Sequence, residues 1–195
     1  MLKKYNVFYA DPPWEQKAGR KLDGYKIVNG IQIWNSSNPK PKNLPYPTMT
    51  VEEIANLPIK NISEKDSILF LWVTNKYLLE SKKVIESWGF TYVACITWKK
   101  KRMGGGLGGV VRITSEYLLF CRKGNLKCVG NIPENVIEAK RPYVNGKPVN
   151  SKKPENFRQI IEELVPDGKR LELFARNNHE KWDAFGNEIE NSIKI

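Results

Sequence analysis

Short apolar runs alternate along this chain with segments whose apolar residues repeat at helical spacing. The runs at 5–10 (YNVFYA), 67–73 (SILFLWV), 91–98 (TYVACITW) and 169–175 (KRLELFA) predict buried strands. Helices are predicted at 50–57, where Thr50 and Glu53 form a capping-box pattern, at 76–89 and at 154–165. Because strands separated by helices build parallel sheets covered on both faces, we expect an α/β fold with a mostly parallel sheet.

The segments between these elements are less regular. Residues 114–121 (TSEYLLFC) suit a strand or a helix, and we favour a strand. Residues 15–47 and 99–112 are expected to form extended loops, and 124–150 to hold little regular structure. The length of 195 residues suits one domain spanning 1–195. In such a sheet, ligands sit at the carboxyl ends of strands, where residues 11–14 and 176–178 are candidate site motifs.

The composition indicates the class of partner. The net charge is +11, and the basic residues cluster around a glycine-rich stretch with only Glu116 opposing them. They are Lys99, Lys100, Lys101, Arg102, Arg112, Arg122 and Lys123. The cluster predicts a polyanionic partner, and the alternative is a solvated face that keeps the protein soluble.

The sequence gives little support for a disulfide framework, a metal site, a membrane span or secretion. Three widely spaced cysteines and one histidine favour neither a disulfide framework nor a metal site, so we expect reduced, packed thiols. The longest apolar run is too short to cross a bilayer, and the N-terminus lacks a secretory signal. We therefore expect a cytoplasmic protein without a membrane partner.

The stretch GGGLGG at 104–109 satisfies the dinucleotide-binding pattern G-x-G-x-x-G. Basic residues separate it from the preceding strand, however, and the β-branched residues after it do not predict a helix. We interpret it as a cationic loop that can approach a phosphate backbone, or as a mobile loop without that role.

The first strand runs directly into Asp11, Pro12, Pro13 and Trp14. Each proline fixes φ and holds the residue before it in an extended conformation. An Asp11 carboxylate beside a backbone C=O of Asp11 or Pro12, with few competing N–H groups, would accept both hydrogens of an –NH₂ group. Trp14 could then lie flat against the ring carrying that group. The alternative is a rigid strand exit with a core tryptophan.

Such a pair of acceptors suits a difficult reaction. The exocyclic nitrogen of adenine is a poor nucleophile because its lone pair is delocalised into the ring. Accepting hydrogen bonds from both N–H groups favours a localised lone pair that can attack a methyl sulfonium. Positioning and electrostatics, without a covalent intermediate, would supply most of the rate.

The sequence resembles the family of S-adenosylmethionine-dependent adenine-N6 methyltransferases related to the catalytic subunit of the eukaryotic mRNA adenine methyltransferase. DPPW is the hallmark of that family. The other similar segments follow in the family's order and cover nearly the whole chain. They are PYPTMTVEEIANLP, LFLWVTN, IESWGFTYV, ITWKK, SEYLLFCRKG, SKKPENFRQIIEELVP, LELFAR and WDAFGNE.

The resemblance implies a Rossmann-like methyltransferase fold in which the catalytic motif precedes the cofactor-binding strand. It implies S-adenosyl-L-methionine as cofactor, no metal, and catalytic roles for Asp11, Pro12, Pro13 and Trp14. The cofactor-binding residues that it implies are Asp11, Lys153, Glu172, Phe174, Arg176, Asn178, Asn187 and Glu188. For Lys153 and Arg176 the alternative is ordinary surface charge.

The resemblance and the charge together predict N6-methylation of adenine in nucleic acid, with DNA favoured and RNA open. The expected nucleic-acid-binding residues are Lys99, Lys100, Lys101, Arg102 and Arg112. A catalytically silent partner subunit, or methylation of a small molecule or protein amide, are the rival hypotheses. We also expect a homodimer or a pair with a related subunit.

Two departures from the family pattern affect these predictions. The chain begins almost at the catalytic strand, so part of the cofactor's adenine pocket is expected to be built otherwise than in many relatives. In addition, 31 residues separate Trp14 from YPTM, and we expect this expanded loop to serve as a target-recognition element.

Overall fold

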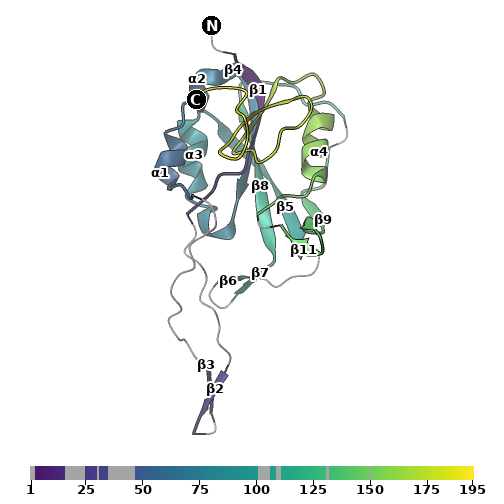
Figure 1. Ribbon diagram of the computed structural model, residues 1–195. Helices are drawn as coiled ribbons and strands as arrows, with labels where there is room; N and C mark the ends of the chain where they lie inside the picture. Colours follow the sequence, from purple (N-terminus) through teal and green to yellow (C-terminus); the bar gives the residue numbers. More distant parts are fainter. Residues whose placement is uncertain are drawn as a thin grey trace.

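The computed structural model describes residues 3–15, 25–29, 31–34, 47–100, 106–108, 111–130, 132–149 and 151–195. A seven-stranded sheet in the order β13-β12-β1-β4-β8-β5-β9 forms its centre (Figure 1). The strands are β1 Tyr5–Ala10, β4 Ser63–Val73, β5 Thr91–Lys100, β8 Ser115–Lys123, β9 Val136–Ala139, β12 Arg170–Leu173 and β13 Trp182–Phe185.

The prediction of a mostly parallel sheet is confirmed. Neighbours from β13 through β12 and β1 to β4 run parallel, as do β5 and β9. Strand β8 lies antiparallel to both β4 and β5. Because β8 is reversed, its first residues lie at the edge where its neighbours end.

Helices cover both faces of the sheet (Figure 1). α1 Val51–Ala55, α2 Ile59–Ile62 and α3 Ser81–Ser87 pack on one face, and α4 Asn156–Leu164 packs on the other. The alternation of side chains along β1 serves both cores, with Phe8 among the first group of helices and Val7 and Tyr9 on the side of α4. This two-sided burial explains why the strands are continuous apolar runs.

The start of α1 forms as the sequence predicts. Thr50 Oγ1 accepts the backbone N–H of Glu53 at 3.2 Å, and the Glu53 carboxylate accepts the N–H of Thr50 at 2.7 Å. The helix predicted at 76–89 is shorter, because a 3-10 turn, η1 Asn75–Tyr77, precedes α3. Tyr77 is buried against Trp14, a long-range contact that local periodicity does not reveal.

The expectation of little regular structure at 124–150 is wrong in part. β9 adds a parallel strand to the edge of the sheet, and β10 Tyr143–Val144 pairs with β11 Lys147–Pro148. The expected loops also contain paired strands, namely β2 Tyr25–Val28 with β3 Ile31–Trp34, and β6 Gly106–Gly108 with β7 Val111–Ile113. These strands have only two to four residues each, too few for a periodic pattern to be decisive, so their pairing partners identify them.

All three cysteines are free, and burial raises the pKa of the Cys121 thiol to about 12, which makes it inert. Among the described helices, none has the length and apolar character needed to span a bilayer.

Candidate active site

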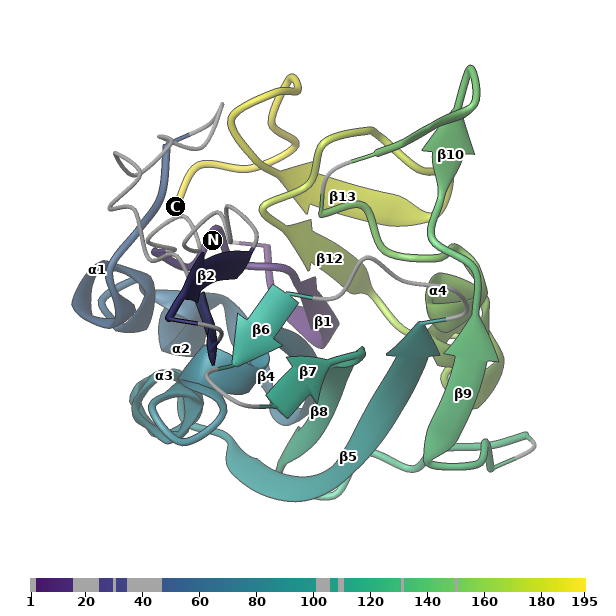
Figure 2. The same ribbon diagram turned by 90° about the horizontal axis from the view of Figure 1, so that it is seen from below.

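The carboxyl ends of β1 and β12 lie next to each other. Ala10 is paired with Leu173, and the N–H of Asp11 donates to the C=O of Leu173 at 3.4 Å. The chain leaves both strands at one edge of the sheet, which Figure 2 views from below. The two motifs predicted as site candidates, beginning at Asp11 and at Arg176, are thereby brought together.

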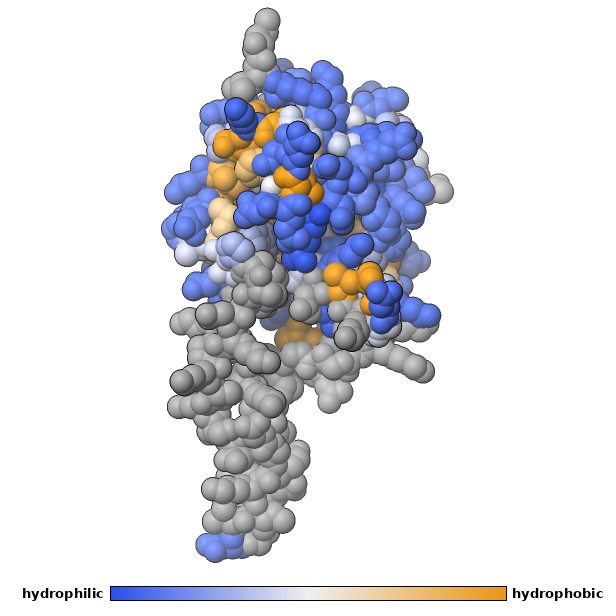
Figure 3. Space-filling view, in the orientation of Figure 1, coloured by the Kyte–Doolittle hydropathy of each residue, from blue (hydrophilic) through white to orange (hydrophobic). Residues whose placement is uncertain are grey.

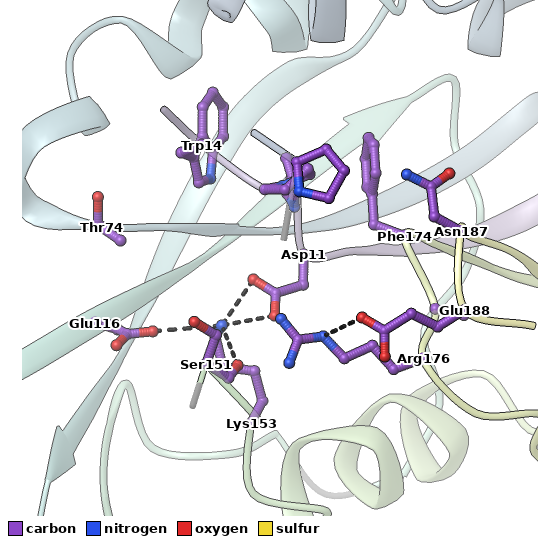
Figure 4. Close-up of a pocket in the computed structure, with 14 residues that line it drawn as sticks. Asp11, Trp14, Thr74, Glu116, Ser151, Lys153, Phe174, Arg176, Asn187 and Glu188 are labelled. Atoms are coloured by element: carbon purple, nitrogen blue, oxygen red, sulfur yellow. Dashed lines mark hydrogen bonds and ion pairs between the residues drawn. The ribbon is translucent and has the colours of Figure 1, made fainter. Parts of the chain in front are cut away.

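A cavity of about 500 Å³ opens at this edge (Figure 4). The predicted site residues that line it come from four separate parts of the chain. They are Asp11, Pro12, Pro13, Trp14, Lys153, Phe174, Arg176, Asn187 and Glu188. A second cavity of about 320 Å³ shares Asp11, Lys153 and Arg176 and is also lined by Glu172. Asn178 is exposed and lines neither cavity, whereas Asn177 and His179 line the smaller one.

Lys153 holds the carboxylate of Asp11. Its Nζ lies 2.7 Å from each carboxylate oxygen and donates to the C=O of Ser151 at 3.1 Å (Figure 4). The Lys153 side chain is 10% exposed, and its ammonium lies 5.3 Å from the centroid of the Trp72 ring. The ammonium therefore fixes the orientation of a carboxylate that remains 29% exposed toward the cavity.

A second carboxylate, Glu116 of β8, completes this charge cluster. It lies 3.5 Å from Lys153 Nζ and also pairs with Lys100. In the sequence, Glu116 stands out only as the acid opposing the basic cluster, and nothing there assigns it to the site. Its position at the polar start of a strand was the available signal, but the antiparallel direction of β8 is what brings it here.

The charges in this cluster shift one another's pKa values. Burial alone would lower the pKa of Lys153, but the carboxylates of Asp11 and Glu116 outweigh it and raise the pKa. Burial alone would raise the pKa of Glu116, but Lys153 and Lys100 lower it below the usual value. Burial raises the pKa of the Asp11 carboxyl, and Lys153 acts against that rise. Lys153 thus stays charged at neutral pH.

Trp14 is buried, which differs from the open stacking surface expected from the sequence. It is 3% exposed, its ring stacks on Tyr77 at a centroid distance of 5.2 Å, and its Nε1 donates to the C=O of Trp72 at 2.9 Å. These contacts anchor the DPPW turn to the core. The edge of Trp14 still lines the larger cavity, and its role in stacking on a base stays a prediction.

The expectation that carbonyls in the DPPW turn have few competing N–H groups is wrong for two of them. The C=O of Pro12 accepts the N–H of Trp14 at 2.8 Å, and the C=O of Pro13 accepts the N–H of Met49 at 2.8 Å. The turn thus satisfies part of its own hydrogen bonding. Each of these oxygens keeps a second lone pair for a ligand.

The loops after β12 and β13 are held close to each other. A Cβ built on Gly186 would lie 2.0 Å from the C=O oxygen of Ala175, so only glycine allows this approach. Phe174 has a φ of 62°, a costly conformation for a residue other than glycine that is typical of functional sites. Arg176 Nε lies 3.9 Å from Glu188 Oε1 across the two loops.

Glu172 is already engaged by an arginine that the sequence analysis did not single out. Its carboxylate lies 2.5 Å from Arg158 Nη1, and the guanidinium lies 5.3 Å from the ring centroids of both Tyr9 and Trp182. Arg158 therefore orients Glu172 at the wall of the smaller cavity, and Glu172 has one carboxylate oxygen left for another partner.

A comparison with models of known protein families finds a match over most of the chain. Residues 5–188 match the model of the MT-A70 family, a span that includes every predicted residue of the candidate active site. The chain belongs to the MT-A70 family. Its sheet and flanking helices are those of the Rossmann-like methyltransferase fold of that family.

Several curated MT-A70 relatives align with the whole chain. The Type II methyltransferase M.MunI of Mycoplasma sp is 32% identical over 200 residues, which cover 99% of this chain and 82% of that protein. The N(6)-adenosine-methyltransferase MT-A70-like protein of Arabidopsis thaliana is 28% identical, with 100% of this chain and 25% of that protein covered. The human catalytic subunit METTL3 is 28% identical, with 97% and 29% covered. The chain thus spans most of the first relative and a quarter or slightly more of the other two.

The basic segment of this MT-A70 protein begins at the same edge of the sheet. Lys99 pairs with Glu138 at 2.9 Å, an acid that the sequence analysis did not count as opposing the cluster, and Lys100 pairs with Glu116. Lys101 and Arg102 lie outside the described residues, as does the side chain of Arg112. Their contact with nucleic acid stays a prediction.

Proposed function

We propose that this protein transfers a methyl group from S-adenosyl-L-methionine to N6 of adenine in nucleic acid, with DNA the preferred substrate. The observation that carries the proposal is the Asp11 carboxylate, fixed by Lys153 in a cavity that Arg176 and Glu188 also line. The DNA preference draws on the Type II methyltransferase among the relatives, whereas others are named as adenosine methyltransferases and keep RNA open.

The residues lining the cavities fit such a donor. S-adenosyl-L-methionine supplies an electrophilic methyl group on a sulfonium, together with a carboxylate, an ammonium and ribose hydroxyls. Lys153 or Arg176 would pair with the carboxylate, and Glu172, Glu188 and Asn187 would accept or share hydrogen bonds with the hydroxyls and the ammonium. Cavities of about 500 and 320 Å³ are within the usual size of small-molecule sites.

In the proposed reaction, Asp11 binds and orients the acceptor nitrogen. Two of the roughly four lone-pair positions of its carboxylate face Lys153, which leaves others to accept an N–H of adenine. Bound S-adenosyl-L-methionine would supply the methyl group: the lone pair of N6 would form the new N–C bond, the electron pair of the broken C–S bond would stay on sulfur, and N6 would then release a proton. Burial raises the pKa of Asp11, which suits it to receive that proton.

A labelling experiment tests the proposal. The protein is incubated with donor carrying a labelled methyl group and with adenine-containing DNA or RNA oligonucleotides. We expect label in N6-methyladenine, more from DNA than from RNA. Labelling of neither polymer would refute the proposed activity, and calorimetry with S-adenosyl-L-methionine would then identify a silent subunit by the lack of heat.

Replacement of Asp11 tests its role directly. Asp11→Asn exchanges an acceptor for a donor and removes the charge that holds Lys153, so turnover should fall by about two orders of magnitude or more. Cofactor affinity should change much less. Asp167→Asn, an exposed aspartate before β12, is the matched control and should turn over normally. Normal turnover of Asp11→Asn would exclude the carboxylate from the mechanism.

The proposal also covers the domain organisation, the location and the assembly of the protein. We propose one domain over 1–195, work in the cytoplasm, and pairing with a second copy or a related subunit. Light scattering of the purified protein measures whether it pairs with a second copy.

A further inference from the structure

The β10–β11 hairpin, residues 143–148, is a hydrogen-bonded element beside the active site. Tyr143 pairs with Pro148 and Val144 with Lys147, and the N–H of Val149 extends the ladder by donating to the C=O of Pro142 at 3.0 Å. Asn145 and Gly146 form the two-residue turn with φ values of 48° and 72°. Positive φ at both positions, with the sequence Asn-Gly, is typical of the tightest class of hairpin turn.

The hairpin lies at the mouth of the smaller cavity. Val144 lines that cavity together with Asp11 and Lys153, and the chain reaches Lys153 within a few residues after β11. Figure 2 shows β10 projecting outward from the rest of the fold. Figure 3 shows a small apolar patch exposed among hydrophilic residues at the lower right, and Val144 of β10 is 56% exposed.

Tyr143 faces away from the cavity. Successive side chains of a strand point to opposite faces, so if Val144 faces the cavity, Tyr143 lies on the outer side. Tyr143 is 60% exposed, so its ring is not used to pack the core. A ligand filling the cavity would therefore leave this ring available for a different partner.

Basic residues precede and follow the hairpin in the chain, with Lys140 and Arg141 before it and Lys152, which lines the smaller cavity, after it. Lys140 and Lys152 are exposed and Arg141 is half-buried. Lys100, in the basic 99–112 segment, is paired in the sheet with Ala139. Lys140 and Arg141 come directly after Ala139 in the chain, so they continue from the strand that neighbours the basic segment. An exposed aromatic ring on a hairpin that basic residues precede and follow matches the chemistry of an unpaired nucleotide, which offers a base to stack and phosphates to neutralise.

We propose that the β10–β11 hairpin docks the nucleic-acid substrate, with Tyr143 stacking on an unpaired base that flanks the target adenine. Lys140, Arg141 and Lys152 contact phosphates of the same strand. This inference rests on the proposed function, and it adds a substrate-binding element that the DPPW turn and the cofactor residues do not provide. Since Tyr143 lies outside the cavity, it affects substrate affinity and leaves cofactor affinity unchanged.

Fluorescence anisotropy of a labelled single-stranded adenine-containing DNA oligonucleotide tests the proposal. Tyr143→Ala should raise the Kd by about tenfold, and Tyr143→Phe, which keeps a ring that can stack, should stay within about twofold of the unsubstituted protein. Tyr92→Ala is the matched control, because Tyr92 is 53% exposed but lies at the opposite end of β5 from Lys100. It should bind the oligonucleotide normally. Calorimetry with S-adenosyl-L-methionine is run on the same variants.

Each result separates the hairpin's role from the enzyme activity. An unchanged Kd for Tyr143→Ala, or equal weakening by Tyr92→Ala, overturns the proposal even if methylation is intact. A parallel loss of cofactor affinity also overturns it, because the residue would then belong to the cofactor site. If no adenine is methylated but Tyr143→Ala alone binds the oligonucleotide more weakly, the hairpin's docking role stands and the proposed methylation fails.

Discussion

Replacing Lys153 with methionine should destabilise the protein in a strongly pH-dependent way. The ammonium makes two contacts of 2.7 Å with Asp11 and one of 3.5 Å with Glu116, while Met keeps most of the apolar stem. Removing one partner of a buried ion pair costs about 3–5 kcal/mol of unfolding free energy. Since Asp11 is 29% exposed and water can solvate it, we expect the lower end, about 3 kcal/mol.

The pH dependence of stability follows from the opposite shifts of Glu116 and Lys153, and the raised pKa of Asp11 makes its unpaired carboxylate costlier as pH rises. The lowered pKa of Glu116 stabilises the fold above its ordinary value of 4.5, and this contribution is lost as pH falls through the folded pKa. The raised pKa of Lys153 stabilises the fold below its ordinary value of 10.5, and this is lost as pH rises through the folded pKa. Both contributions are present between those values, so the variant's deficit is largest there and shrinks on acidification.

Urea unfolding at about pH 8 and about pH 3, below the ordinary pKa of Glu116, measures this deficit. Lys99→Met is the control, because Lys99 and Glu138 form a solvent-exposed pair and its removal should cost less than about 1 kcal/mol. Equal stability of Lys153→Met and the unsubstituted protein at pH 8, or a loss that does not change with pH, would refute the reasoning.

Three further perturbations have defined outcomes. Gly186→Ala places a Cβ 2.0 Å from the Ala175 carbonyl oxygen, so we expect a lower Tm and weaker S-adenosyl-L-methionine binding by calorimetry; an unchanged protein would mean that the loops separate easily. Thr50→Ala removes the cap of α1 and should cost about 1 kcal/mol in urea unfolding, while Thr50→Ser should restore most of it. Neutralising the four basic residues 99–102 should weaken nucleic-acid binding and flatten its salt dependence, and an unchanged slope would assign their charge to solubility.

Local sequence determined much of this fold because burial and periodicity are properties of short segments. The run 5–10, apolar on both faces, predicts a central strand, and the spacing of Phe157, Ile161 and Leu164 predicts the buried face of α4. Thr50 and Glu53 specify a cap through contacts three residues apart. The resemblance that begins at DPPW supplied the proposed cofactor-binding residues, most of which line the two cavities.

Only the tertiary structure decided how these segments meet. Asp11 and Lys153 are 142 residues apart, and neither segment alone indicates that the lysine holds the carboxylate. The reversed direction of β8 delivers Glu116, and the packing of Tyr77 turns Trp14 into a buried anchor. Pairing and register depend on the packing of the whole sheet, so a short strand such as β9 or β13 is recognised only by its neighbour. The charges of the site are therefore set by contacts between distant segments, which no local pattern in the sequence encodes.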